Sequence, residues 1–140
     1  MIEGARTEAL LVLADPALGA LRDAIVAGCQ RGLSISALLT GTGDLECGQV
    51  ARHPRAESEA QELTDTLIVV ADGREALIGS TDTDMTAAIT RNHNLVLIAR
   101  QFVWMELFAQ RVYSRLGAKL LARLDPDDQR IFESYAASSD

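Results

Sequence analysis

The chain has few side chains that could act as a catalytic base. It contains two histidines, His53 and His93, and each would need a carboxylate partner to form a general-base pair. The candidate partners are acidic residues that lie close to apolar segments, namely Asp65, Asp72 and Asp82. An enzyme of the phosphodiesterase type, using one of these pairs, is therefore one hypothesis that the sequence leaves open.

Other motifs that could bind ligands are incomplete. Gly41-Thr42-Gly43 lacks the third glycine of a dinucleotide fingerprint and the Lys-Ser/Thr pair of a P-loop. Asp82 and Asp84 occupy a polar turn that has neither the central glycine nor the closing glutamate of an EF-hand loop. Arg52, His53 and Arg55 could contact an anion, but such a cluster is more often a solvated edge. We therefore expect no metal ion and no cofactor.

The two cysteines, Cys29 and Cys47, lack the C-x-x-C spacing of zinc and redox sites. We expect both to be reduced thiols that act as small packing residues. No apolar run approaches the roughly 20 residues that span a bilayer, and the N-terminus lacks the basic region and cleavage site of a signal peptide. These features favour a cytoplasmic protein with no membrane contact.

Length and composition predict one folded domain over residues 1–140. Hydrophobic residues make up 48% of the chain and charged residues 24%, which is typical of a globular protein. The formal net charge is −7. Because phosphate binding draws on clustered Lys and Arg, this charge argues against direct nucleic-acid binding by this chain.

The N-terminal third predicts a strand-helix-strand unit. An uninterrupted apolar run over residues 9–14 suits a strand covered on both faces. Asp15 is expected to be the N-cap of the following helix, with Pro16 at its first position. A second strand over residues 33–39 should be parallel to the first, with a right-handed crossover. The polar stretch over residues 49–62 is expected to be mostly exposed.

The stretch from Leu63 to Ser80 predicts a β-hairpin. Two apolar runs, residues 67–70 and 76–78, flank an Ala-Asp-Gly-Arg turn, and Asp-Gly between such runs is a strong hairpin signal. Residues 85–90 are expected to add one more strand. Parallel and antiparallel pairs together predict an α/β fold with a mixed sheet flanked by helices.

A helix of about 22 residues, some 33 Å long, is predicted before Gly117. Its expected core stripe steps by three or four residues: Leu95, Ile98, Phe102, Met105, Ala109, Val112 and Leu116. Further apolar residues widen this stripe, so the helix should be covered on more than one side. Trp104, Phe108 and Tyr113 are therefore candidates for a homodimer interface, or alternatively all three belong to the core. Beyond Gly117 we expect another turn or two, a final helix over residues 127–135 and a frayed tail.

The hairpin resembles the second half of a phospholipase D-type motif, in which a His-x-Lys pair enters one strand and Gly-Ser-x-Asn closes the next. The matching residues in this chain are Thr64 for the His, Thr66 for the Lys, Ala71 or Asp72 for the following Asp, Gly79-Ser80 for Gly-Ser and Asp82 for the Asn. Threonine supplies neither an imidazole nucleophile nor a cation for the phosphate. The resemblance therefore implies a phospholipase D-like half-domain without the reaction.

Nearly the whole chain resembles the C-terminal effector domain of TrmB-family archaeal sugar-responsive transcription regulators. The hairpin and the stretch ARQFVWMELFAQR carry this resemblance. Such a regulator would begin with a winged helix, which this sequence does not predict. The chain is thus expected to be a fragment or a stand-alone effector module, and DNA contact is expected only through a region outside it.

The resemblance implies a regulatory domain that senses a small polar ligand, such as a sugar or sugar phosphate, and is not an enzyme. The expected ligand contacts are Thr64, Thr66, Ser80 and Asp82, with Arg91 and His93 nearby. Each of these residues also has an ordinary structural role open to it, in a strand, a turn or a helix cap. A protein-protein interaction module without a metabolite ligand is the main alternative, and a phosphodiesterase-like enzyme is the second.

Overall fold

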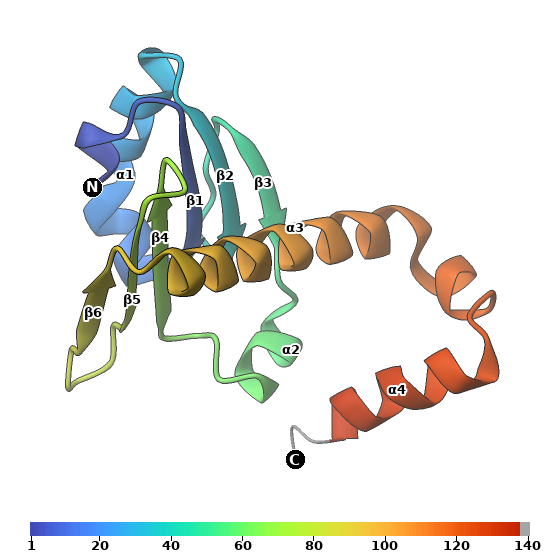
Figure 1. Cartoon of the computed structure of the whole chain (residues 1–140). Helices are drawn as coiled ribbons and strands as arrows, with labels where there is room; N and C mark the ends of the chain where they lie inside the picture. The colour runs from blue at the N-terminus through green and yellow to red at the C-terminus, as the bar shows by residue number, and fades with distance from the viewer. Residues whose placement is uncertain (138–140) are drawn as a thin grey trace.

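The structure is a computed structural model that describes residues 1–137, with all of their side chains except those of residue 60 and residues 132–137 (Figure 1). One sheet carries the strands β1 (Glu8–Leu13), β2 (Ser34–Leu39), β3 (Gln49–Arg52), β4 (Thr66–Ala71), β5 (Glu75–Ser80) and β6 (Ala87–Thr90). The helices are η1 (Ile2–Gly4, a 3-10 turn), α1 (Asp15–Gln30), α2 (Arg55–Ala60), α3 (His93–Leu121) and α4 (Pro126–Ala137).

The six strands lie in the order β3-β2-β1-β4-β5-β6. β1 pairs with β2 in parallel, and β2 pairs with β3 in parallel. β4 runs antiparallel to β1, and β5 and β6 continue the antiparallel half of the sheet. The sequence prediction of a mixed sheet flanked by helices, with a long C-terminal helix, is confirmed.

Helices cover both faces of the central strands, as Figure 1 shows. Leu11 and Leu13 of β1 belong to the core cluster under α1, whereas Leu10 and Val12 belong to the cluster under α3. All four are at most 1% exposed. A strand buried on both faces needs no polar alternation, which explains the continuous apolar run of β1.

The predicted core stripe of α3 is wrong. Val96, Val103 and Leu107 face the sheet, whereas Ile98 is 65% exposed and Met105 is 61% exposed. The helix carries two apolar stripes on different faces, and periodicity alone does not tell which one meets the sheet. The exposed stripe is the larger of the two in side-chain size.

The end of α3 follows the prediction closely. Gly117 has φ 44° and ψ −129°, so the helical path is broken there before it resumes towards Leu121. Only glycine adopts this backbone conformation readily. α4 follows at Pro126, and the part of the predicted frayed tail over residues 138–140 lies outside the described residues.

Residues 49–62, predicted to be exposed, form β3 and α2 instead. His53 and Ser58 are among the most buried polar residues, with 1% and 0% exposure. The physical reason is that Ala51 and His53 lie on the side of β3 that faces α3, so this short edge strand completes the core cluster there. A four-residue strand with two arginines nearby gives little periodic signal from which to predict it.

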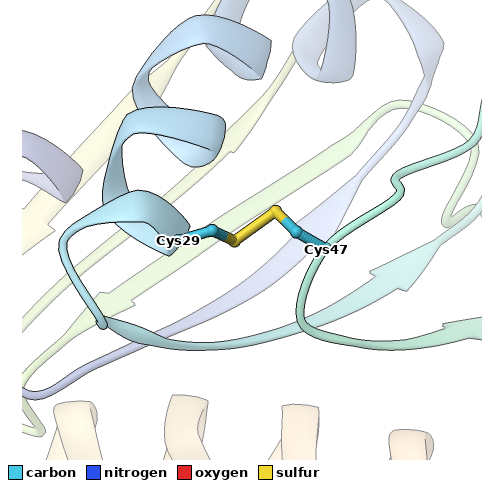
Figure 2. Close-up of a disulfide and its surroundings, with 2 residues drawn as sticks. All are labelled: Cys29 and Cys47. Atoms are coloured by element: carbon cyan, nitrogen blue, oxygen red, sulfur yellow. A yellow bond between two sulfur atoms is a disulfide. The ribbon is translucent and has the colours of Figure 1, made fainter.

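The expectation of two reduced cysteines is also wrong, because Cys29 and Cys47 form a disulfide (Figure 2). The last turn of α1 and the loop before β3 bring the two Cα atoms to 6.4 Å, a separation that a disulfide spans. This proximity results from the crossover connection and has no signature in the 18-residue spacing. The cysteines therefore no longer support a reducing compartment.

Asp72 fastens the N-terminus to the hairpin turn. Its carboxylate accepts hydrogen bonds from the backbone amides of Arg6, Thr7 and Glu8, at 2.8 to 3.1 Å, and from the Thr7 hydroxyl at 2.8 Å. Burial opposes the charge, but these donors outweigh it and hold the pKa of Asp72 well below its usual range. The Asp position of the phospholipase D-type motif thus has a structural role in this chain.

Candidate ligand-binding site

A polar pocket lies at the carboxyl ends of β1 and β2, where ligands commonly bind in open α/β sheets. Its volume is about 410 Å³, and its lining comes from the start of α1, the loop after β2, α2 and the entry to β4. The lining residues are Ala14, Asp15, Pro16, Thr40, Gly41, Thr42, Arg55, Glu59 and Thr64. Four separate segments therefore converge on one hollow of metabolite size.

The Gly-Thr-Gly loop beside this pocket is folded around Asp15. The Asp15 carboxylate accepts hydrogen bonds from the Thr42 amide (2.9 Å), the Thr42 hydroxyl (2.8 Å) and the Gly43 amide (2.7 Å). These bonds, that of the Thr42 amide foremost, lower the pKa of Asp15. A Cβ at Gly41 would lie 2.2 Å from Asp15 Oδ1. The loop's amides thus bind the chain's own carboxylate, which gives the glycine motif a structural explanation.

Asp15 also corrects the predicted cap of α1. Ala14 is the N-cap, and Asp15 is the first helical residue, so its side chain is free to reach the loop after β2. Arg52 completes the arrangement by donating to the carbonyl oxygens of Gly41 (2.6 Å) and Gly43 (2.7 Å). These hydrogen bonds therefore fix the conformation of residues 41–43, which border the pocket.

Thr40 is the most unusual residue of the pocket. It is 2% exposed, and its hydroxyl has no hydrogen-bond partner within the described residues. An unpaired buried hydroxyl typically costs about 1 to 3 kcal/mol. Arg55 and Glu59 face the same hollow, with Arg55 Nε 3.1 Å from Glu59 Oε1. The pocket lining thus combines one cation and two carboxylates with Thr40, whose unpaired hydroxyl is itself buried.

The structure brings three of the six sequence-predicted ligand residues to this end of the sheet. Thr64 lines the pocket. Thr66 and Ser80 are cross-strand partners at the open end of the hairpin. The Thr66 hydroxyl donates to the Glu62 carbonyl (3.3 Å), while the Ser80 hydroxyl accepts from the Asp82 amide (3.2 Å).

The other three predicted ligand residues, Asp82, Arg91 and His93, make contacts elsewhere. The Asp82 carboxylate accepts from the Thr83 amide (2.7 Å) in the following turn. Arg91 pairs with Glu75 (3.0 Å) at the opposite end of β5, and exposed His93 begins α3 two residues later. Five residue steps of strand amount to about 17 Å, so Arg91 and His93 lie away from the pocket.

Thr40, Asp15, Arg55 and Glu59 were not among the predicted ligand residues. A signal for the first two was present in the sequence, because the carboxyl ends of two parallel strands predict a shared edge. Arg55 had been considered only as a possible anion contact in the Arg52-His53-Arg55 cluster, and no signal existed for Glu59, since α2 itself was not predicted.

The predicted pairing of a histidine with Asp65, Asp72 or Asp82 is not found among the described contacts. His53 Nδ1 lies 2.9 Å from Ser58 Oγ, and its Nε2 lies 3.6 Å from a carboxylate oxygen of Glu106 on α3. Desolvation opposes the charged imidazole, but Glu106 and the Pro54 carbonyl outweigh it and raise the pKa of His53. His53 and Ser58 are buried, whereas the Glu106 side chain is 22% exposed, so the imidazole itself has no open path to a substrate.

The candidate dimer residues lie on one part of α3. Trp104 is half-buried beside the core, Phe108 is 65% exposed and Tyr113 is 37% exposed. Trp104 and Phe108 line a groove of about 480 Å³ next to Gln49 of the edge strand β3. Aromatic side chains of α3 thus line an exposed groove beside the edge of the sheet.

Residues 1–137 contain neither a candidate membrane-spanning helix nor a candidate metal-binding cluster. None of the helices in this range combines the length and hydrophobicity needed to cross a membrane. In the same range, no three His, Cys, Asp or Glu side chains gather closely enough to hold a metal ion.

Solved structures share this architecture. NucT from Helicobacter pylori superposes with a TM-score of 0.58 at 10% identity, over 78% of this chain and 83% of that one. TrmBL2, described as an archaeal chromatin protein with a novel mode of DNA binding, gives 0.54 at 15% identity, over 75% of this chain and 45% of that one. The likeness is one of fold. Nuc from Salmonella typhimurium, a phospholipase D family member, gives 0.47 at 16% identity, over 78% and 82%. Neither a protein-family model nor a curated protein sequence matches the chain.

Proposed function

We propose that this chain is a regulatory domain that binds a small polar metabolite and dimerises, on a phospholipase D-like scaffold without phosphodiesterase activity. The observation that carries the proposal is the pocket at the carboxyl ends of β1 and β2, with the unpaired hydroxyl of Thr40. A ligand hydroxyl or phosphate oxygen would satisfy that group once the lining moves to expose it, because the Thr40 hydroxyl is buried. The class of ligand is a sugar or sugar phosphate, as in the regulators that the hairpin and the long helix resemble.

The residues that line the pocket support the proposed lack of phosphodiesterase activity. Its titratable side chains are Asp15, Arg55 and Glu59, and Asp15 is already engaged by three hydrogen bonds. Thr64 stands where a phospholipase D-type enzyme has its nucleophilic imidazole. No group in this lining can form the covalent phosphoryl intermediate of such an enzyme.

The resemblance to sugar-responsive regulators and the fold shared with TrmBL2 support the regulatory part of the proposal. Contact with DNA would come from a winged-helix region outside this chain. The cytoplasm expected from the sequence has no support from the cysteines, which form a disulfide. The main alternative, an interaction module without a ligand, is less well supported because the pocket is polar and its buried hydroxyl is unpaired. A phosphodiesterase-like enzyme is the second candidate to be tested.

Dimerisation is the second part of the proposal, and the exposed stripe of α3 supports it. Phe108 and Met105 are both more than 60% exposed, and Trp104 and Tyr113 flank them. Large apolar side chains gathered on one helix favour a two-fold interface, because a second copy buries the same stripe. Light scattering at micromolar concentration should give twice the mass of 15.1 kDa.

Thermal unfolding in the presence of glucose, maltose, glucose 6-phosphate and fructose 6-phosphate tests the ligand proposal. A ligand at about 100 times its dissociation constant should stabilise the chain by about 2.7 kcal/mol. Thr40→Val should abolish the shift, whereas Thr86→Val, on an exposed turn, should keep it. No shift with any of the four compounds would contradict ligand sensing.

The companion measurement is hydrolysis of bis(p-nitrophenyl) phosphate. We expect no turnover above buffer. Turnover that is lost in His93→Ala would revive the enzyme hypothesis and contradict the proposal.

A further inference from the structure

The charges of this chain are divided unevenly between two parts. Residues 108–124, which we call the helical arm, contain four cations and no acidic residue: Arg111, Arg115, Lys119 and Arg123. The rest of the chain holds the other 9 Lys and Arg and all 20 Asp and Glu, a formal charge of −11 against +4 for the arm. Such a division in an acidic protein indicates a surface built for a partner of opposite charge.

The arm extends beyond its own domain. Leu107 is the last buried residue of α3, and no residue from Phe108 to Leu124 is buried. Figure 1 shows this part of α3 projecting past the edge strand β3. Among the side chains that the structure describes, no carboxylate lies within ion-pair distance of any of the four arm cations. The contacts of the arm with α4 include hydrogen bonds from the Gln129 side-chain amide to the carbonyl oxygens of Leu121 and Leu124, which leave the four cations without a described carboxylate partner.

The arm carries apolar residues as well as cations. Phe108 and Leu116 are 65% and 49% exposed, and Val112 lies between them on the same side of the helix. Arg111 and Arg115, one turn apart, line the same groove as Trp104 and Phe108. A partner must therefore supply both an apolar surface and negative charge.

An acidic segment of the same chain has the complementary charge. Between residues 56 and 65 there are four acids and no cation: Glu57, Glu59, Glu62 and Asp65. This segment begins in α2, shortly after the edge strand β3, and runs back beneath the sheet to the start of β4 (Figure 1). The acidic segment therefore begins near the edge of the sheet that the arm passes.

We propose that the helical arm of one subunit docks against the acidic segment 56–65 of a second copy, and that the two-fold symmetry repeats this contact. The exposed apolar stripe of α3 packs against the same stripe of the partner at the centre. A second copy supplies both the apolar surface and the carboxylates that the arm needs, whereas nucleic-acid phosphates would leave Phe108 and Leu116 uncovered. The inference rests on the proposed dimerisation and names the contact that directs it.

Charge-swap variants test this contact. One variant carries Arg111→Glu and Arg115→Glu, a second carries Glu62→Lys and Asp65→Lys, and a third carries all four. Glu62 and Asp65 are exposed and lie outside the pocket lining. The matched control is Arg6→Glu with Arg74→Glu, two exposed cations that change the net charge by the same amount as the arm variant. Circular dichroism verifies that each variant is folded.

Sedimentation equilibrium then measures the dissociation constant of self-association. We expect each two-site variant to weaken the dimer at least about tenfold, because like charges face each other, and the four-site variant to recover most of the loss. The control should change the dissociation constant by less than about threefold.

Three outcomes would overturn the inference. A dimer that the arm variant leaves unchanged would refute the docking contact while the proposed dimerisation stands. A wild-type chain that stays monomeric up to about 100 μM would refute both. Binding of a 20-base-pair DNA duplex that the arm variant abolishes, with self-association intact, would assign the arm to nucleic acid instead.

Discussion

Reduction of the Cys29–Cys47 disulfide provides a quantitative test of the fold, because its effect follows from the path of the chain. The bond joins the last turn of α1 to the loop that leads into β3, and it closes a loop of 18 residues (Figure 2). In the unfolded state the bond restricts this loop. Reduction removes the restriction and leaves the folded state with the same hydrophobic core.

The chain-entropy relation gives the size of the effect. A closed loop of about 18 residues corresponds to about 3 kcal/mol of stability at 25 °C. With an unfolding entropy of about 2.1 cal/mol/K per residue, a chain of this length should lose about 10 °C in Tm. Both Cys29 and Cys47 are partly exposed, so a soluble reductant should reach them.

Differential scanning calorimetry with and without a phosphine reductant measures this loss, and mass spectrometry after thiol alkylation counts the free cysteines. The Cys29→Ser, Cys47→Ser double variant should unfold at the Tm of the reduced wild type and should not respond to reductant. Two alkylated thiols in the untreated protein, or a loss below about 1 kcal/mol on reduction, would refute this account of the disulfide.

Three further predictions concern single residues. Asp72→Asn should lower the free energy of unfolding, measured in urea at neutral pH, by about 2 kcal/mol. Because the pKa of Asp72 is lowered in the folded state, the difference from wild type should shrink below about pH 4. A difference that does not depend on pH would contradict this role of Asp72. Glu106→Gln should lower the free energy of unfolding by about 1 to 2 kcal/mol near pH 5 and by less near pH 9. Because the pKa of His53 is raised in the folded state, Glu106 stabilises the protonated imidazole, and this contribution is complete below about pH 6.5 and is lost as the pH rises. A larger effect at pH 9 than at pH 5 would be evidence against the pair. Gly41→Ala should lower stability by about 1 to 3 kcal/mol, since its Cβ would meet Asp15 Oδ1 at 2.2 Å, and an unchanged Tm would show that the loop is not packed as described.

Many elements of the fold could be predicted because each depends on a short local sequence pattern. The apolar run of β1, the Asp-Gly turn before β5 and the helix break at Gly117 each depend on a few neighbouring residues. For this reason the strand-helix-strand unit, the hairpin and the long helix could be predicted. Their parallel and antiparallel pairings follow from connection length, and the structure confirms them.

The errors concern contacts between distant segments. The facing of α3 depends on which of two apolar stripes meets the sheet, and the disulfide depends on where the loop before β3 passes α1. The burial of His53 depends on α3 covering a short edge strand that the sequence barely signals. Each of these is a property of tertiary packing, which overrides local propensity.

The candidate site shows the same division. Thr64 was predicted from the resemblance to the phospholipase D-type motif, in which it takes the place of the histidine, and it lines the pocket. Thr40 and Asp15 come from the ends of β1 and β2, and they meet Thr64 only because β4 pairs with β1 in the antiparallel sense. Arg91 and His93 were expected beside them, but the length of β5 separates the two ends of the hairpin.

Chemical-shift mapping tests the central claim most directly. The ¹⁵N-labelled chain would be titrated with glucose, maltose, glucose 6-phosphate and fructose 6-phosphate, and the amide signals would be followed by residue. We expect at least one of these compounds to shift the amides of residues 40–43 and Thr64, and to lose this effect in Thr40→Val. Shifts confined to the Arg91 and His93 end of the hairpin, or no shift with any of the four compounds, would contradict the account.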